Sequence, residues 1–186
     1  MKSKVTVMMS GGVDSTIAAQ LLTDQGYSVE GVHFGLPGKD SSSNTSGWEK
    51  VKDFCKKLAI PYHFFDVRSL FEQSVIRYFI DSYIEGFTPN PCVICNATIK
   101  FGLFFDYAMK ELKADFIASG HYARRKTYRN RWYVQEALDK TKDQSYFLYT
   151  LAQKVLEKTL FPLGGLTKNE VISIARERHF ISDDYQ

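Results

Sequence analysis

The stretch Ser10-Gly11-Gly12-Val13-Asp14-Ser15 carries the strongest fold signal in this chain. An apolar run, Val5-Thr6-Val7-Met8-Met9, comes directly before it, and a run with helical character at residues 16–22 comes directly after it. A strand, a glycine-rich turn and a helix start in this order form an anion site, because the glycines let the backbone approach a ligand and the first N–H groups of the helix point at it. The hydroxyls of Ser10 and Ser15 add hydrogen-bond donors.

Strand and helix signals alternate along the rest of the chain. We expect strands at 5–9, 27–34, 61–67 and 115–119, and helices at 15–24, 48–58, 69–85 and 96–112. A two-stranded ribbon at 124–139 and helices at 144–151, 154–159 and 168–179 follow, and the serine-rich segment 39–47 is expected to be a loop near the site. Such alternation predicts an α/β fold with a doubly wound parallel sheet, whose ligands bind at the carboxyl ends of the strands. We expect a nucleotide-binding domain at 1–140 and a small helical extension at 141–186.

Composition limits the class of protein. A chain of 186 residues with 44% hydrophobic content can bury a proper core. A net charge of +3 is too small to identify a nucleic-acid binder by itself. One segment is strongly basic and interleaved with aromatic side chains, and it comprises Tyr122, Arg124, Arg125, Lys126, Tyr128, Arg129, Arg131, Trp132 and Tyr133. It suits either RNA contacts or a solvated hairpin.

Targeting signals are not evident in the sequence. We expect no stretch long and apolar enough to span a membrane, and the N-terminus runs straight into the first strand, which leaves no room for a signal peptide. Three cysteines without a secretory context predict a reducing, cytoplasmic setting.

The second informative segment is Thr88-Pro89-Asn90-Pro91-Cys92-Val93-Ile94-Cys95-Asn96. Its prolines predict a stiff loop, and Asn96 is a good cap for the helix that follows. This places Cys95 beside a helix N-terminus, where the pKa of a thiol is lowered and the thiolate is favoured.

The Cys-x-x-Cys spacing of Cys92 and Cys95 leaves several hypotheses. Half of a zinc site is disfavoured, because no second ligand pair follows at the required spacing. A redox pair and two ligands of an iron–sulfur cluster both stay open, with Cys55 or a residue beyond this chain as a third ligand. Cys55 itself falls on the apolar face of its helix, which favours a place in the core.

The first motif lacks the Gly-Lys-Ser/Thr of a Walker loop and instead resembles the SGGxDS loop of the ATP pyrophosphatases, the PP-loop enzymes. Together with the cysteine segment, further stretches resemble the tRNA-specific 2-thiouridylases over nearly the whole chain. They are Ile99-Lys100-Phe101, Ser119-Gly120-His121-Tyr122, Lys142-Asp143-Gln144-Ser145-Tyr146-Phe147-Leu148-Tyr149 and Phe161-Pro162-Leu163-Gly164.

This resemblance implies an adenine nucleotide alpha hydrolase-like fold and a tRNA-uridine 2-sulfurtransferase that uses ATP and Mg²⁺. It implies a nucleotide site made by Met8, Met9, Ser10, Gly11, Gly12, Val13, Asp14, Ser15, Phe34 and Gly120, in which Asp14 organises Mg²⁺ and phosphates and no separate metal-ligand set is assigned. It further places Asn90, Pro91 and Cys92 around a flipped-out uridine, Lys142, Asp143 and Gln144 on the tRNA, and Cys95 in the catalytic step. The implied partners are tRNA and a sulfur-donor protein.

Two departures from the family pattern affect these expectations. Members of this family carry a second catalytic cysteine beyond the position of His179, and the given sequence reaches Gln186 without it, so we expect ATP binding without complete thiolation by this chain alone. Cys92 stands where many members have Asp, which favours an internal disulfide or a cluster. The rival functions are another PP-loop enzyme, including an iron–sulfur-dependent tRNA thiolase, and a nucleotide- or RNA-binding module without catalysis.

Overall fold

A five-stranded parallel sheet forms the centre of the computed structural model, which describes residues 2–38 and 47–182. The strand order is β3-β2-β1-β4-β7, built from β1 (Lys4–Met8), β2 (Ser28–Gly35), β3 (Tyr62–Asp66), β4 (Phe116–Ser119) and β7 (Thr159–Leu160). The chain adds β2 and β3 on one side of β1 and then β4 and β7 on the other. The switch point of the sheet therefore lies between β1 and β4, where open α/β sheets bind their ligands. The expected doubly wound fold is confirmed.

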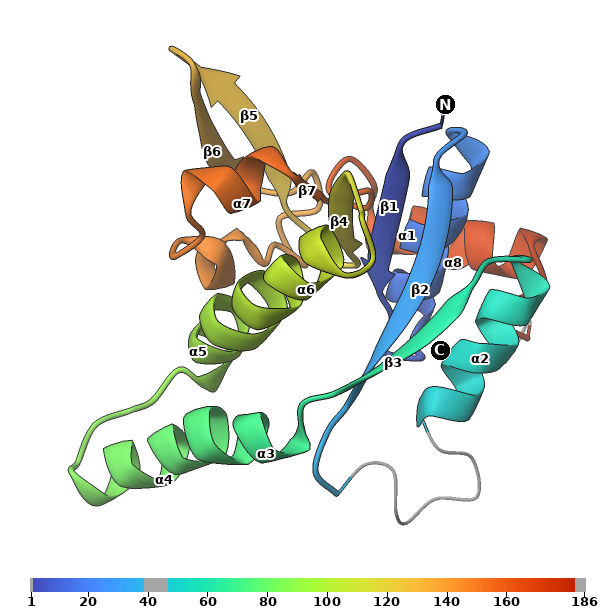
Figure 1. Cartoon of the computed structure of the whole chain (residues 1–186). Coiled ribbons are helices and arrows are strands. Elements are labelled where there is room, and N and C mark those ends of the chain that lie inside the picture. Colours follow the sequence, from blue (N-terminus) through green and yellow to red (C-terminus); the bar gives the residue numbers. More distant parts are fainter. Residues whose placement is uncertain (1, 39–46, 183–186) are drawn as a thin grey trace.

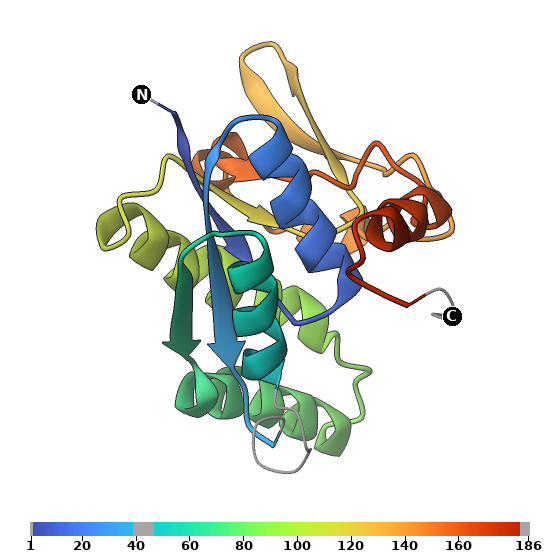
Figure 2. The same ribbon diagram turned by 90° about the vertical axis from the view of Figure 1, so that its right-hand side faces the viewer.

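Helices cover both faces of this sheet. On one face lie α1 (Val13–Asp24) and α2 (Gly47–Lys57), with α8 (Lys168–Glu177) packed on α1, and on the other lies α6 (Phe104–Lys110) (Figures 1 and 2). The alternation of β1 divides its side chains between the two layers, because successive residues of a strand point to opposite faces. Val5 and Val7 pack in the layer that contains α1 and α2, and Met8 packs with Phe104 in the other layer.

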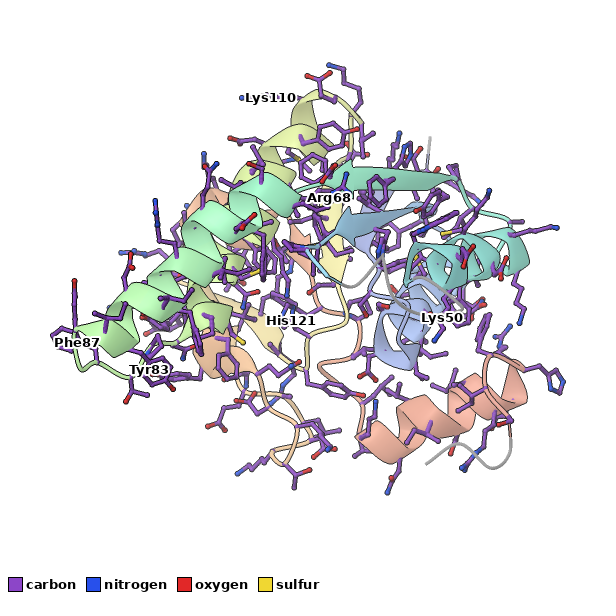
Figure 3. The ribbon with its side chains drawn as sticks, turned by 90° about the horizontal axis from the view of Figure 1, so that it is seen from below. Lys50, Arg68, Tyr83, Phe87, Lys110 and His121 are labelled. Atoms are coloured by element: carbon purple, nitrogen blue, oxygen red, sulfur yellow. The ribbon has the colours of Figure 1, made fainter. Side chains whose placement is uncertain are left out.

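A helical arm lies beyond the carboxyl ends of β2 and β3. It comprises α3 (Arg68–Phe71), the π-helix η1 (Glu72–Ile76) and α4 (Arg77–Ile84), which form the single helix expected at 69–85. None of the residues of α4 is buried. Ile84 is 78% exposed and Phe87 66% exposed, and Figure 3 shows Tyr83 and Phe87 at the tip of the arm, far from His121.

The return half of the arm is one continuous helix over Pro91–Lys110, made of α5 (Pro91–Cys95), the π-helix η2 (Asn96–Leu103) and α6. By length and composition alone this helix could cross a membrane, so the expectation that no stretch is long and apolar enough is wrong. Its aromatic residues Phe101, Phe104 and Phe105 pack in the core of the domain.

The expected ribbon is present as the antiparallel pair β5 (Arg124–Tyr128) and β6 (Arg131–Gln135). Arg129 and Asn130 both have positive φ, as a two-residue type I′ hairpin turn requires. Two of the arginines serve the fold: Arg125 lies 4.4 Å above the Trp132 ring and donates to the Leu156 carbonyl, and Arg124 donates to the Glu136 carbonyl. Whether the remaining cations contact RNA stays a prediction.

The last part of the chain holds the short helices η3 (Ser145–Leu148), α7 (Gln153–Glu157) and α8. The helix expected at 154–159 ends earlier, and Thr159 and Leu160 instead pair with β4 as the edge strand β7. The proposed division at residue 140 stays a prediction. The loop expected at 39–47 lies outside the described residues except for Gly47, which begins α2.

Candidate nucleotide site

The loop between β1 and α1 is closed by its own polar groups. The Ser10 N–H donates to Ser15 Oγ at 3.1 Å, the Ser15 hydroxyl donates to the Gly12 carbonyl at 3.0 Å, and the Gly12 N–H donates to Ser10 Oγ at 3.3 Å. Gly11 has φ +83°, a left-handed conformation that favours glycine. No side chain caps α1. Its first N–H groups are thus available to an anion.

Gly120 brings the end of β4 directly against this loop. A Cβ atom at position 120 would lie 2.9 Å from the Ser15 nitrogen and 3.0 Å from the Asp14 carbonyl carbon. No side chain fits in that space, and the neighbouring atoms are backbone, which cannot move aside cheaply. Gly120 is therefore the residue that lets the loop and β4 form one crevice at the switch point.

A cavity of about 490 Å³ opens at this crevice. Nine of the residues expected to bind nucleotide or tRNA line it: Met8, Met9, Ser10, Asp14, Ser15, Phe34, Gly120, Lys142 and Gln144. Gly11 and Gly12 shape the turn behind it, and Val13 packs in the core instead. The cavity is also lined by residues to which the sequence assigned no role in a site: His33, Leu36, Lys100, Ser119, His121 and Lys168. Tyr122 lines it too, although it was expected in a segment for RNA contacts or a solvated hairpin, and its side chain is buried.

Asp14 is the centre of a polar network. Its Oδ1 accepts a hydrogen bond from Tyr122 Oη at 3.0 Å and from Lys168 Nζ at 2.5 Å. Burial and the Asp14 charge raise the pKa of Tyr122 far above its usual value, so this hydroxyl stays a donor. The side chain expected to organise Mg²⁺ and phosphates is thus placed and oriented by α8 and by the chain after β4.

His121 lies half-buried at the cavity wall in its neutral form. Its Nδ1 lies 2.8 Å from Ser119 Oγ. Burial, together with the Lys100 charge, lowers the pKa of His121 to about 3, since the charged imidazolium loses its hydration there. A second histidine, His33, donates from Nδ1 to the Met9 carbonyl at 3.1 Å. The two imidazole groups lie on opposite sides of the end of β1. His121 follows β4, which pairs with β1 on one side, and His33 lies in β2, which pairs with β1 on the other.

The segment Lys142-Asp143-Gln144 divides into different roles. Gln144 holds the chain after β4 with two hydrogen bonds to Tyr122. Its side-chain Oε1 accepts from the Tyr122 N–H at 3.0 Å, and its backbone N–H donates to the Tyr122 carbonyl at 2.8 Å. Asp143 does not line the cavity, and its carboxylate accepts from the Ala137 N–H and from the Ser145 hydroxyl. Lys142 lines the cavity.

The cysteine segment differs from its expected structure. Asn90 caps a helix that begins at Pro91, with Asn90 Oδ1 accepting from the Val93 N–H at 3.3 Å. The prediction of a loop with a helix starting at Asn96 is wrong, because proline at the first helical position loses no hydrogen bond and has the right φ. Cys95 is therefore inside a helix, and burial raises its pKa, so the expected lowering by a helix N-terminus is also wrong.

The thiols are spread over different environments. Cys92 is exposed, Cys95 packs beside Val67, Val75 and Ile99, and neither lines the cavity. Cys55 is in the core as expected, with its Sγ 3.7 Å from Met9 Sδ. All three are free thiols, so a disulfide stays a prediction. Among residues 2–38 and 47–182 no three His, Cys, Asp or Glu side chains converge as a metal site, so Cys92 and Cys95 have no third ligand in this part of the chain and a cluster stays a prediction.

The fold and cavity define the class as an adenine nucleotide alpha hydrolase-like α/β domain. A 4-thiouridine synthetase in complex with RNA and bound ATP has the same fold, with a TM-score of 0.65 and 19% identity over 95% of this chain and 40% of that one. The U34-tRNA thiolase NcsA from Methanococcus maripaludis, solved with its [4Fe-4S] cluster, gives a TM-score of 0.54 at 20% identity over 99% and 58% of the two chains.

Sequence similarity then identifies the family. Residues 3–186 match the tRNA methyl transferase HUP domain, and the chain belongs to this family. The tRNA-specific 2-thiouridylase MnmA of Synechococcus sp. is 45% identical over 94% of this chain and 49% of its own length, and that of Treponema denticola is 45% identical over 96% and 50%. The resemblance to 2-thiouridylases is confirmed. The chain spans about half the length of these curated relatives.

Proposed function

We propose that this chain is the ATP-using part of a tRNA-uridine 2-sulfurtransferase, which transfers AMP to the 2-oxygen of the wobble uridine so that sulfur can replace that oxygen. The observation that carries the proposal is the junction of the Ser10–Ser15 loop with Gly120 at the mouth of a lysine-lined cavity. It is supported by the 45% identity to 2-thiouridylases.

The site suits the adenylylation step. The uridine 2-carbonyl is a poor electrophile, so its oxygen attacks the α-phosphorus of ATP, the bond from that phosphorus to the bridging oxygen breaks, and pyrophosphate leaves with the electron pair. The N–H groups at the start of α1 and the cavity lysines would hold the phosphate charge. Mg²⁺ binds through one or two carboxylates plus substrate phosphates, and Asp14 fits this requirement. When bound, Mg²⁺ would neutralise charge on the phosphates.

The sulfur step is assigned to Cys95, with tRNA and a sulfur-donor protein as partners. Because Cys92 and Cys95 lie outside the cavity lining, the target base would have to leave its stack and reach from the nucleotide toward α5. The outer sulfur of a persulfide on the donor would attack C2, and AMP would leave. The Cys95 thiolate would then attack the inner sulfur of the donor, so that the S–S bond breaks, its electron pair stays with the sulfur on C2, and Cys95 forms a disulfide with the donor cysteine. No step is assigned to an iron–sulfur cluster. We propose a cytoplasmic setting, which the free thiols of Cys55, Cys92 and Cys95 support.

The decisive experiment is pyrophosphate release with MgATP and a tRNA transcript, comparing the unmodified chain with Asp14→Asn. Loss of the carboxylate should lower the rate about 100-fold or more, because it removes the group that would hold Mg²⁺ against the phosphates. Asp24→Asn, at the far end of α1 in an exposed ion pair with Arg178, is the matched control and should keep the rate.

The same assay separates an enzyme from a binding module. Tight ATP binding without any pyrophosphate release would favour the module, and an unchanged rate in Asp14→Asn would contradict the site. Nucleoside analysis of the tRNA tests the second half of the proposal, in which this chain alone adenylylates but forms no 2-thiouridine.

A further inference from the structure

Lys168 lies at the phosphate loop although 154 residues separate it from Asp14. Its Nζ donates to Asp14 Oδ1 at 2.5 Å and lies 5.9 Å from the centre of the Tyr122 ring. It lines the same cavity as Ser10 and Ser15. An ammonium group is therefore fixed beside the loop that would receive the phosphates.

The position of Lys168 is set by several independent contacts. It is the first residue of α8, directly after Thr167, whose side chain forms a reciprocal capping box with Glu170. The Lys168 N–H donates to Asp139 Oδ2 at 3.0 Å. These contacts anchor the backbone of Lys168, so its side chain has a fixed origin at the cavity edge.

A lysine at the first position of a helix is electrostatically unfavourable. The N-terminus of a helix carries partial positive charge and disfavours a cation in the first turn. Sequences break such rules mainly where function requires it. The carboxylates of Asp14 and Asp139 compensate for the cost in the structure, and a phosphate group would compensate for it further.

The charge balance of the cavity points to a polyanion. Its described lining carries three lysines, Lys100, Lys142 and Lys168, against the single carboxylate of Asp14. His121 adds no charge, since its pKa is lowered to about 3. The N-termini of α1 and α8 add partial positive charge at the same edge. Of the three lysines, Lys168 is the one that is paired with the loop itself.

We infer that Lys168 binds the β- and γ-phosphates of ATP and that Asp14 holds the ammonium group in place for them. This inference rests on the proposed use of ATP. As the bond between the α-phosphorus and the bridging oxygen breaks, the electron pair leaves with pyrophosphate, and Lys168 balances the growing charge without giving up a proton.

The test is calorimetric binding of MgATP, AMP and inorganic pyrophosphate to the full chain and to Lys168→Met. Loss of one charge-assisted contact should weaken MgATP and pyrophosphate binding about 10- to 100-fold. AMP lacks the β- and γ-phosphates, so its affinity should stay within about twofold. Lys168→Arg should restore most of the MgATP affinity. Lys110→Met is the control, because Lys110 is exposed and lies far from His121 (Figure 3).

Each outcome has one meaning. The inference is overturned if Lys168→Met weakens the binding of AMP as much as the binding of MgATP. It is also overturned if Lys168→Arg weakens MgATP binding as much as Lys168→Met does, because either result means that the lysine has a structural role. If the variant binds MgATP as the unmodified chain does, the inference fails and the proposed function stands. If the unmodified chain binds neither MgATP nor pyrophosphate, both fail.

Discussion

The phosphate loop and the cysteine segment are both short motifs with clear chemical signatures, yet only the first folds as its residues predict. The Ser10–Ser15 loop builds its site from backbone N–H groups and from hydroxyls that hydrogen-bond within the loop. The cysteine segment depends on a side chain whose ionisation is set by its surroundings. Cys95 is inside a helix and packed beside Val67 and Ile99, so its pKa is raised.

The two segments differ because backbone direction is a local property of the chain, whereas the charge state of a thiol is not. Backbone direction follows from a few neighbouring residues, and a strand, two glycines and a helix start are enough to fix it. The charge state of a thiol follows from burial and from where its helix begins, and both depend on packing across the arm. Variants of Gly120, alkylation of Cys95 and a variant of His121 test this difference.

Gly120→Ala tests whether the loop depends on close contact with β4. The new Cβ would lie 2.9 Å from the Ser15 nitrogen, so the strand end must move away from the loop. We expect MgATP affinity to fall at least about tenfold and the free energy of unfolding to fall by about 1–3 kcal/mol, as overpacking does elsewhere. Titration calorimetry and urea unfolding measure the two effects.

The matched control is Gly165→Ala, because a Cβ at position 165 meets nothing within 4 Å. It should leave both quantities nearly unchanged. Normal ATP affinity in Gly120→Ala would show that the loop forms its site without β4 beside it.

Alkylation by iodoacetamide tests the environment of Cys95. The thiolate is the reacting form, so the half-buried Cys95 should react about tenfold more slowly than the exposed Cys92 at pH 7. Its rate should keep rising above pH 9, because burial raises its pKa above the usual value of 9.0. Peptide mass mapping between pH 7 and pH 10 gives each rate.

Cys55 is the internal reference, since burial raises its pKa to about 11 and it should react most slowly. Faster alkylation of Cys95 than of Cys92 at pH 7 would restore the interpretation of a thiolate activated by a helix N-terminus.

The pH dependence of the free energy of unfolding tests whether His121 stays uncharged at the cavity wall. The pKa of His121 is about 3 in the folded chain, against a usual value of 6.5 for histidine, so between these values the unfolded chain binds a proton that the folded chain does not. Stability should therefore fall as the pH falls from 6.5 toward 3. His121→Gln should flatten this part of the profile, measured as urea midpoints at pH 7.5 and 4.5.

The exposed residue His179 provides the control, and His179→Gln should keep the slope of the unmodified chain. An unchanged slope in His121→Gln would mean that the imidazole is hydrated and protonates freely in the folded state.

Periodicity and turn residues predicted the four long strands, the ribbon and most helices, because these depend on neighbours along the chain. They missed β7, whose two residues pair with β4 only because α7 delivers them to the sheet edge. They also predicted a helix start at Asn96 instead of Pro91, because the prolines of this segment indicate a loop. The nine predicted residues that line the cavity come from segments at three strand ends and one later loop.

The phosphate loop, the parallel α/β sheet and the family follow from the amino-acid sequence, because they depend on local pattern and on residue identity. The pairing of Lys168 with Asp14, the need for a glycine at position 120, and the uncharged state of Cys95 and His121 follow only from the folded structure. The physical reason is that burial and the charges contributed by distant segments exist only once the chain has folded.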